Sequence, residues 1–72
     1  MNQMFEFEGY EGPCALRFDL ITGIRQDDAK KTDGLVSIIS FMSGASEDFY
    51  RSRESFETLM CRYVTTQRIF TL

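Results

Sequence analysis

Apolar and charged residues alternate at the start of the chain, where residues 4–8 read Met-Phe-Glu-Phe-Glu. A period of two is typical of a half-buried β-strand, because successive side chains point to opposite faces of a sheet. Residues 9–13 hold two glycines and the only proline and predict a turn. The alternation resumes over residues 14–20 and runs on as an apolar segment to residue 24. Gly23 within that segment predicts a bulge or bend in one long, curled strand.

Two more strands are predicted in the middle of the chain. Residues 26–34 are polar and charged and close on Asp33-Gly34, which is typical of a hairpin loop. Residues 35–42 form the most apolar run and are expected to be the central strand, followed by a turn at 43–46 and a short strand at 47–51. Adjacent apolar residues such as Phe49 and Tyr50 must point to opposite faces. The second face is therefore expected to be closed by barrel curling, by the C-terminal tail or by another chain.

The period changes to 3.6 after Ser52, which we expect to cap an amphipathic helix. One stripe of this helix is apolar and is expected to cover the sheet; it comprises Phe56, Leu59, Met60, Tyr63 and Val64. The poor helix formers at 65–66 predict its end. The tail that follows is apolar, so we expect it to pack as an added strand or against another subunit through Ile69, Phe70 and Leu72.

Together these elements predict a single domain over residues 1–72 of the α+β class. The expected architecture is a small antiparallel β-meander of three to four strands, with the possibility of curling, covered by one C-terminal helix. With 43% hydrophobic and 14% aromatic residues, the composition excludes a disordered acidic tail.

Charge narrows the classes of partner. Eight basic and eleven acidic residues leave a net charge of −3, and the basic residues are scattered rather than clustered. Duplex nucleic acid is usually held by a basic stripe, so direct nucleic-acid binding is disfavoured. No apolar run approaches the ~20 residues needed to cross a bilayer, and the N-terminus lacks the features of a signal peptide. We therefore expect a cytoplasmic protein without a membrane partner.

Catalytic chemistry has few candidates in this chain. There is no histidine, which removes the commonest general base and the commonest metal ligand. Cys14 and Cys61 are far apart and form no Cys-x-x-Cys motif, so we expect buried free thiols, with a disulfide as the alternative. We predict that the protein is not an enzyme and binds no metal or cofactor.

One order of motifs resembles a known family. Ile21 and Ile24, Gly44, and the segment Glu-Ser-Phe-Glu-Thr-Leu at 54–59 follow one another as in small bacterial and phage proteins of the flagellar FlbD type. The resemblance covers a little over half of the chain and consists of packing motifs. It implies a non-enzymatic regulatory or accessory protein and assigns no functional residue.

These features favour a small acidic protein-binding module, such as a phage or mobile-element regulator or inhibitor of a host macromolecular enzyme. An aromatic anchor among carboxylates would dock on a basic surface of the partner protein. The candidate partner-binding residues lie in two groups, namely Glu6, Glu8, Tyr10 and Glu11, and Glu47, Asp48 and Tyr50. The alternative is a structural homo-oligomer, a homodimer or larger, that assembles through its sheet edge or its tail.

Overall fold

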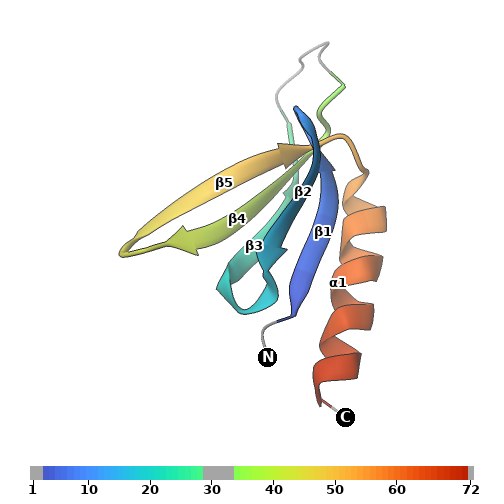
Figure 1. Cartoon of the computed structure of the whole chain (residues 1–72). Helices are drawn as coiled ribbons and strands as arrows, with labels where there is room; N and C mark the ends of the chain where they lie inside the picture. Colours follow the sequence, from blue (N-terminus) through green and yellow to red (C-terminus); the bar gives the residue numbers. More distant parts are fainter. Residues whose placement is uncertain (1–2, 29–33, 72) are drawn as a thin grey trace.

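The computed structural model describes residues 3–28 and 34–71, with the backbone alone for 68–71. It has five strands, one short 3₁₀ turn and one helix (Figure 1). In chain order these are β1 (Met4–Gly9), β2 (Gly12–Arg17), η1 (Phe18–Leu20), β3 (Ile21–Gln26), β4 (Ser37–Ser43), β5 (Ser46–Ser52) and α1 (Phe56–Thr71). All strand pairs are antiparallel, in the order β2-β1-β5-β4-β3. The predicted α+β class with a C-terminal helix is confirmed.

The sheet has five strands rather than three to four because the long strand expected at 14–24 is divided. The turn η1 separates β2 from β3, and the two halves lie at opposite edges of the sheet. The sheet is open: β2 pairs with β1 and β3 with β4, so the described strands do not close a barrel. The predicted irregularity at Gly23 is confirmed, because the register of β3 on β4 shifts between Ile21 and Gly23.

The sheet is joined weakly at its middle. Strands β1 and β5 are paired only at Gly9 and Ser52, and beyond that point they diverge (Figure 1). The β4–β5 hairpin consequently projects away from the β1–β2 hairpin. Strand β4, expected as the central strand, lies one place from the edge, and β5 takes the middle place in the strand order.

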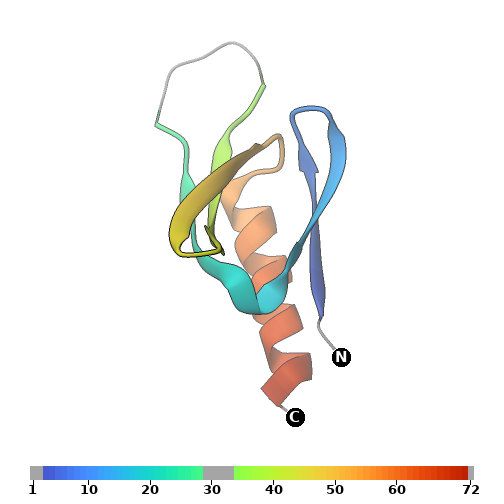
Figure 2. The same ribbon diagram turned by 60° about the vertical axis from the view of Figure 1, so that its left-hand side comes forward.

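The core lies on the inner face of this open sheet. The main cluster of buried apolar side chains comes from β1, β2, β4 and α1 and comprises Phe5, Phe7, Leu16, Ile39, Phe41 and Leu59. Figure 2 shows α1 between β1 and β3, the two strands with which it makes its most extensive contacts. Tyr63 of α1 stacks on Phe18, with ring centroids 4.8 Å apart, and meets Phe5 edge-on. The apolar stripe predicted for the helix therefore does pack on the sheet.

Both ends of α1 differ from the sequence prediction. The helix begins after Ser55, whose Oγ accepts a hydrogen bond from the Thr58 N–H at 3.1 Å, as an N-cap does. The expected cap, Ser52, is instead the last residue of β5. The helix continues past Thr65 and Thr66, whose hydroxyls donate to the carbonyls of the residues four positions earlier, each at 2.9 Å.

The tail is consequently not an added strand, since the backbone of residues 67–71 belongs to α1. The side chains of Ile69 and Phe70 and the whole of Leu72 lie outside the described residues, so their predicted docking stays a prediction. Over the described residues, α1 is neither long nor apolar enough to span a membrane.

Candidate protein-interaction site

Strand β5 occupies the middle of the sheet yet is exposed along most of its length. Residues 46–50 are exposed on both faces, and only Ser52 at the end of the strand is buried. The side chains of Phe49 and Tyr50 are 52% and 47% exposed. The cause is the divergence of β1, which leaves β5 with one partner strand, β4, up to Ser52. A middle strand is normally covered, so this exposure marks β5 as a candidate binding surface.

The turn between β4 and β5 determines which backbone groups of β5 face away from β4. Gly44 has φ +65°, which suits a tight two-residue hairpin closed by the pair Ser43 and Ser46. Hydrogen-bonded pairs then recur at every second residue, so Asp48 and Tyr50 bond to β4. The alternate residues Glu47, Phe49 and Arg51 direct their N–H and C=O groups away from β4, and Arg51 lies at the end where β1 joins β5 at Ser52. We call this backbone row the β5 edge.

Two contacts agree with this assignment of the β5 edge. The Phe49 N–H donates to the side chain of its neighbour, Asp48 Oδ1, at 2.8 Å instead of entering the β4 ladder. Two residues beyond the edge, the Arg53 N–H donates to the Glu8 carbonyl of β1 at 3.0 Å. The side away from β4 is thus occupied by β1 at Arg53 and is open toward solvent at Phe49.

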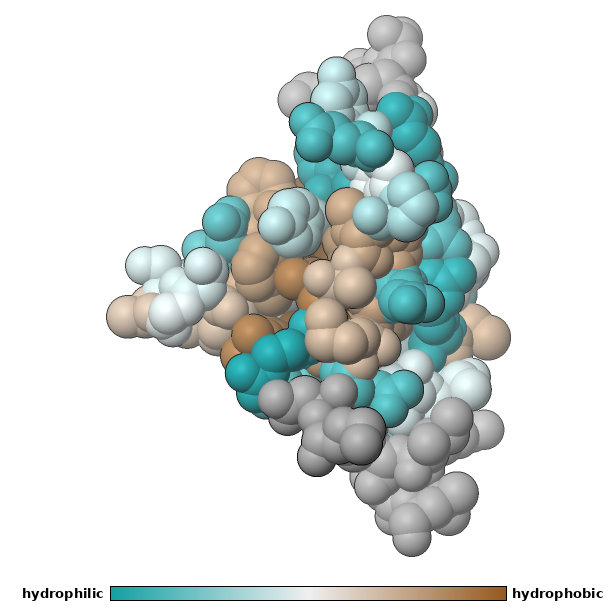
Figure 3. Space-filling view, viewed as in Figure 1, coloured by the Kyte–Doolittle hydropathy of each residue, from teal (hydrophilic) through white to brown (hydrophobic). Residues whose placement is uncertain are grey.

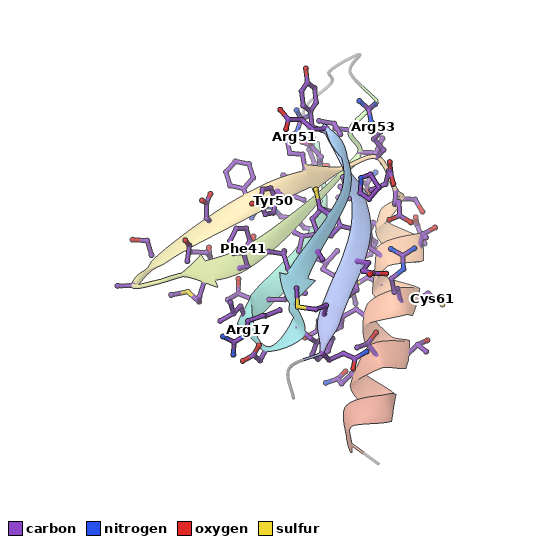
Figure 4. The ribbon with its side chains drawn as sticks, in the orientation of Figure 1. Arg17, Phe41, Tyr50, Arg51, Arg53 and Cys61 are labelled. Carbon is purple, nitrogen blue, oxygen red and sulfur yellow. The ribbon has the colours of Figure 1, made fainter. Side chains whose placement is uncertain are left out.

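Aromatic side chains flank the β5 edge on both faces. On the inner face, the Tyr50 ring stacks on Phe41 with centroids 5.0 Å apart and lies 6.0 Å from Phe7 (Figure 4). Figure 3 shows apolar side chains gathered on this face between the β4–β5 hairpin and β2. On the outer face, Phe49 is paired across the ladder with the small Ser40 and therefore stands clear of large neighbours in β4.

The outer face of β5 also carries charges of both signs. The Glu47 carboxylate accepts a hydrogen bond from Thr22 of β3 at 2.9 Å. Arg51 lies at the other end of the strand, where its Nε donates to Asp27 Oδ2 at 2.7 Å, and the Asp27 side chain is 5% exposed. The side chains of Glu47 and Arg51 are thus both held by contacts with other residues of the chain. From Glu47 through Phe49 to Arg51, the outer face is successively acidic, aromatic and basic.

The corresponding edge of β1 is closed by the helix. Glu54 accepts hydrogen bonds from the Glu8 N–H at 2.9 Å and from both terminal nitrogens of Arg62, at 2.8 and 2.6 Å. Arg62 also donates to the Glu6 carbonyl at 2.8 Å. The hydrogen bond from Arg62 lowers the pKa of Glu54, and the same contact raises the pKa of Arg62. Glu54, just before α1, and Arg62, within α1, thus occupy the place beside β1 where a neighbouring strand would otherwise lie.

A shallow groove of about 760 Å³ runs beside this ion pair, along β1, β2 and α1. Its walls include Glu6, Glu8, Glu54 and Arg62, of which Glu54 and Arg62 are paired with each other. No group of three or more metal-binding side chains is found among the described residues. Cys14 and Cys61 are both free thiols; Cys61 is exposed and Cys14 half-buried, so the expected burial of both is wrong.

The structure separates the two groups of candidate residues. Glu6 and Glu8 are exposed on the outer face of β1, and Tyr10 and Glu11 lie in the β1–β2 turn, where Arg53 Cζ is 6.0 Å from the Tyr10 ring. The second group, Glu47, Asp48 and Tyr50, lies on β5, nearer the tip of the other hairpin (Figure 1). The two groups do not form one continuous surface.

Sequence reasoning did not include Phe49 and Arg51 among the candidates, although both belong to the β5 edge. Their signal is the alternation over 46–52, which puts Glu47, Phe49 and Arg51 on one face. The Glu54–Arg62 pair was also missed, and its spacing of eight residues across a helix start carries no recognisable pattern. No protein family, curated protein or solved structure matches this chain.

Proposed function

We propose that this chain is a non-enzymatic protein-binding module that recognises another polypeptide along β5. The observation that carries the proposal is the exposure of a middle strand on both faces together with its outward backbone edge. An exposed strand edge binds a partner strand by main-chain hydrogen bonds, while side chains on alternate positions supply selectivity. The β5 edge offers the main-chain hydrogen bonds, and the flanking aromatic residues offer the selectivity.

The aromatic residues suit the role of anchors. Tyr and Phe bury large areas in interfaces at a small cost in side-chain entropy, and binding energy is concentrated in few such residues. Tyr50 is already oriented by its stack on Phe41, so little further ordering is needed on binding. Phe49 is about half exposed in the free chain and gains the remaining burial only from a partner.

The acidic residues at the start of β5 indicate the charge of the partner. Glu47 and Asp48 precede the aromatic pair, and the chain carries a net charge of −3. A basic residue in the partner strand would face them and speed association through electrostatic attraction. Coverage of a surface on a larger protein is the mechanism by which such a module would regulate or inhibit that protein.

Differential capture tests this function. The tagged chain is incubated with lysate of the organism that encodes it, and bound proteins are compared for the parent, Phe49→Thr and a matched control, Val36→Thr. Val36 is 43% exposed, so the control removes a comparable exposed apolar group away from the β5 edge. We expect a protein retained by the parent and by Val36→Thr to be lost with Phe49→Thr. Retention of the same proteins by all three would contradict the proposal.

A further inference from the structure

The inner face of β5 sets a carboxylate beside an aromatic ring. Asp48 and Tyr50 are two residues apart on one strand, so their side chains share a face, and Asp48 is paired across the ladder with Phe41. Both residues are exposed. Tyr50 remains 47% exposed although one face of its ring is stacked on Phe41 (Figure 4), so part of the ring is open to a ligand.

In the free chain the Asp48 carboxylate occupies the β5 edge. Its Oδ1 accepts a hydrogen bond from the Phe49 N–H at 2.8 Å, and this N–H is a group that a partner strand needs for pairing. The open part of the edge consists of Glu47 and Phe49, because β1 lies on the same side from Ser52 and Arg53 onward. A partner strand that bonds to the Phe49 N–H therefore displaces the carboxylate of Asp48.

The displaced carboxylate requires a new partner within the interface. A charged group that loses its contact with water is strongly unfavourable unless it is paired and hydrogen-bonded. Among the described residues, no basic side chain forms an ion pair with Asp48. Glu47 adds negative charge beside the same edge, and the chain as a whole carries a net charge of −3. The positive charge must therefore come from the bound segment.

We infer that the segment recognised by β5 presents an arginine at this point, whose guanidinium stacks on Tyr50 and binds the Asp48 carboxylate. This recognition rests on the proposed binding along β5 and names the residue that β5 selects. A guanidinium lies flat on an aromatic ring and donates two parallel hydrogen bonds to a carboxylate, whereas a lysine ammonium is a compact point charge. One arginine side chain reaches both groups, since same-face neighbours on a strand are about 6–7 Å apart.

Selection from a displayed library of random short peptides tests this preference without assuming a partner. The library is selected on the parent chain, on Phe49→Thr and on Asp48→Asn. Asn keeps an oxygen that can accept the Phe49 N–H, but it lacks the charge. We expect the parent to enrich peptides with arginine at one fixed place, about tenfold or more over lysine at that place. Phe49→Thr should lose these peptides, and Asp48→Asn should lose the preference for arginine.

Calorimetric titration with an enriched peptide measures the contact. Replacement of its arginine by lysine should raise the dissociation constant about tenfold or more for the parent and less than about threefold for Asp48→Asn, because the two-point contact needs the carboxylate. Glu11→Gln removes one charge in the exposed β1–β2 turn and should behave as the parent. Tyr50→Leu, which keeps an apolar side chain beside Phe41, should weaken binding of the arginine peptide, whereas Tyr10→Leu in the same turn should not. Circular dichroism melts confirm that each variant is folded.

The outcomes separate this inference from the proposed function. Peptides that depend on Phe49 but contain arginine no more often than lysine would overturn the inference and support binding along β5. A parent that enriches no peptide through Phe49 would overturn both. A preference for arginine that Asp48→Asn leaves intact arises elsewhere, for example in the groove beside Glu6 and Glu8, and would also overturn the inference.

Discussion

The contact between Glu54 and Arg62 gives a quantitative prediction, because it holds α1 on the otherwise unpaired edge of β1. The Glu54 side chain is 22% exposed and that of Arg62 is 37% exposed. In Glu54→Gln the side-chain oxygen still accepts from the Glu8 N–H, while the charge and the two-point contact with Arg62 are lost. The variant therefore isolates the ionic part of the contact.

The expected loss follows from the partial exposure of the pair. Fully exposed ion pairs contribute about 0.2–1 kcal/mol, and hydrogen bonds to charged groups about 1.5–3 kcal/mol when water is excluded. A pair of intermediate exposure should contribute about 1 kcal/mol to the free energy of unfolding at neutral pH. A domain of this size is typically stable by roughly 4–10 kcal/mol, so the loss is measurable without unfolding the chain.

Urea unfolding at a series of pH values measures this contribution. The Arg62 hydrogen bond lowers the pKa of Glu54 in the folded state, so the unfolded chain binds the proton more readily. The contribution is complete above the unfolded value of about 4.3 and is lost as the pH falls through the folded-state pKa. Between about pH 5 and pH 3 the parent should therefore lose more stability than Glu54→Gln. Below this range the free energies of unfolding of the two proteins should become similar.

An exposed ion pair within the same chain is the control. Arg17 and Asp19 form a two-point contact at 2.8 and 3.2 Å, with side chains 46% and 55% exposed. Asp19→Asn should change the stability by less than about 0.5 kcal/mol. Equal losses from Asp19→Asn and Glu54→Gln, or a difference between parent and Glu54→Gln that does not vary with pH, would refute the reasoning.

Three further predictions concern the core, a turn and the thiols. Leu59 is fully buried, so Leu59→Ala should cost about 2–5 kcal/mol in urea unfolding, whereas Cys61→Ala on the exposed face of α1 should cost less than about 0.5 kcal/mol; similar losses would show that α1 does not pack as described. Gly44 has φ +65°, so Gly44→Ala should lower the free energy of unfolding by about 1 kcal/mol. The control Gly23→Ala should change it little, because a Cβ at Gly23 meets no atom within 4 Å. A neutral Gly44→Ala would count against the tight turn. A thiol reagent should modify Cys61 faster than Cys14 in the folded protein, because Cys61 is exposed and Cys14 only partly so; equal rates would contradict their placement.

Local patterns were sufficient for much of the fold. The alternation over 4–8 correctly placed Phe5 and Phe7 in the core, since a strand has only two faces and the opposite face carries Glu6 and Glu8. The 3.6-residue stripe likewise placed Leu59 and Tyr63 against the sheet. The bulge at Gly23 was also predicted, because a glycine that interrupts an alternating strand often marks a bulge or a bend.

Other features depended on contacts between distant segments. The alternating pattern over 14–20 and its apolar continuation to 24 gave no sign of the 3₁₀ turn at residues 18–20, which forms where the chain leaves β2, beside β1, and enters β3, beside β4. The threonines at 65–66 have low intrinsic helix propensity, but the packing of α1 on the sheet outweighs a penalty of a few tenths of a kcal/mol per residue.

The candidate site shows the same division. The sequence alone determined that Glu47, Phe49 and Arg51 share one face of a strand, because side-chain direction follows from the two-residue period of the backbone. It could not determine whether a neighbouring strand covers them. That depended on the divergence of β1 from β5 beyond Gly9 and Ser52, and on the closure of the β1 edge by Glu54 and Arg62. Strand neighbours are chosen by long-range packing, which no local pattern encodes, and so only the tertiary structure left β5 exposed.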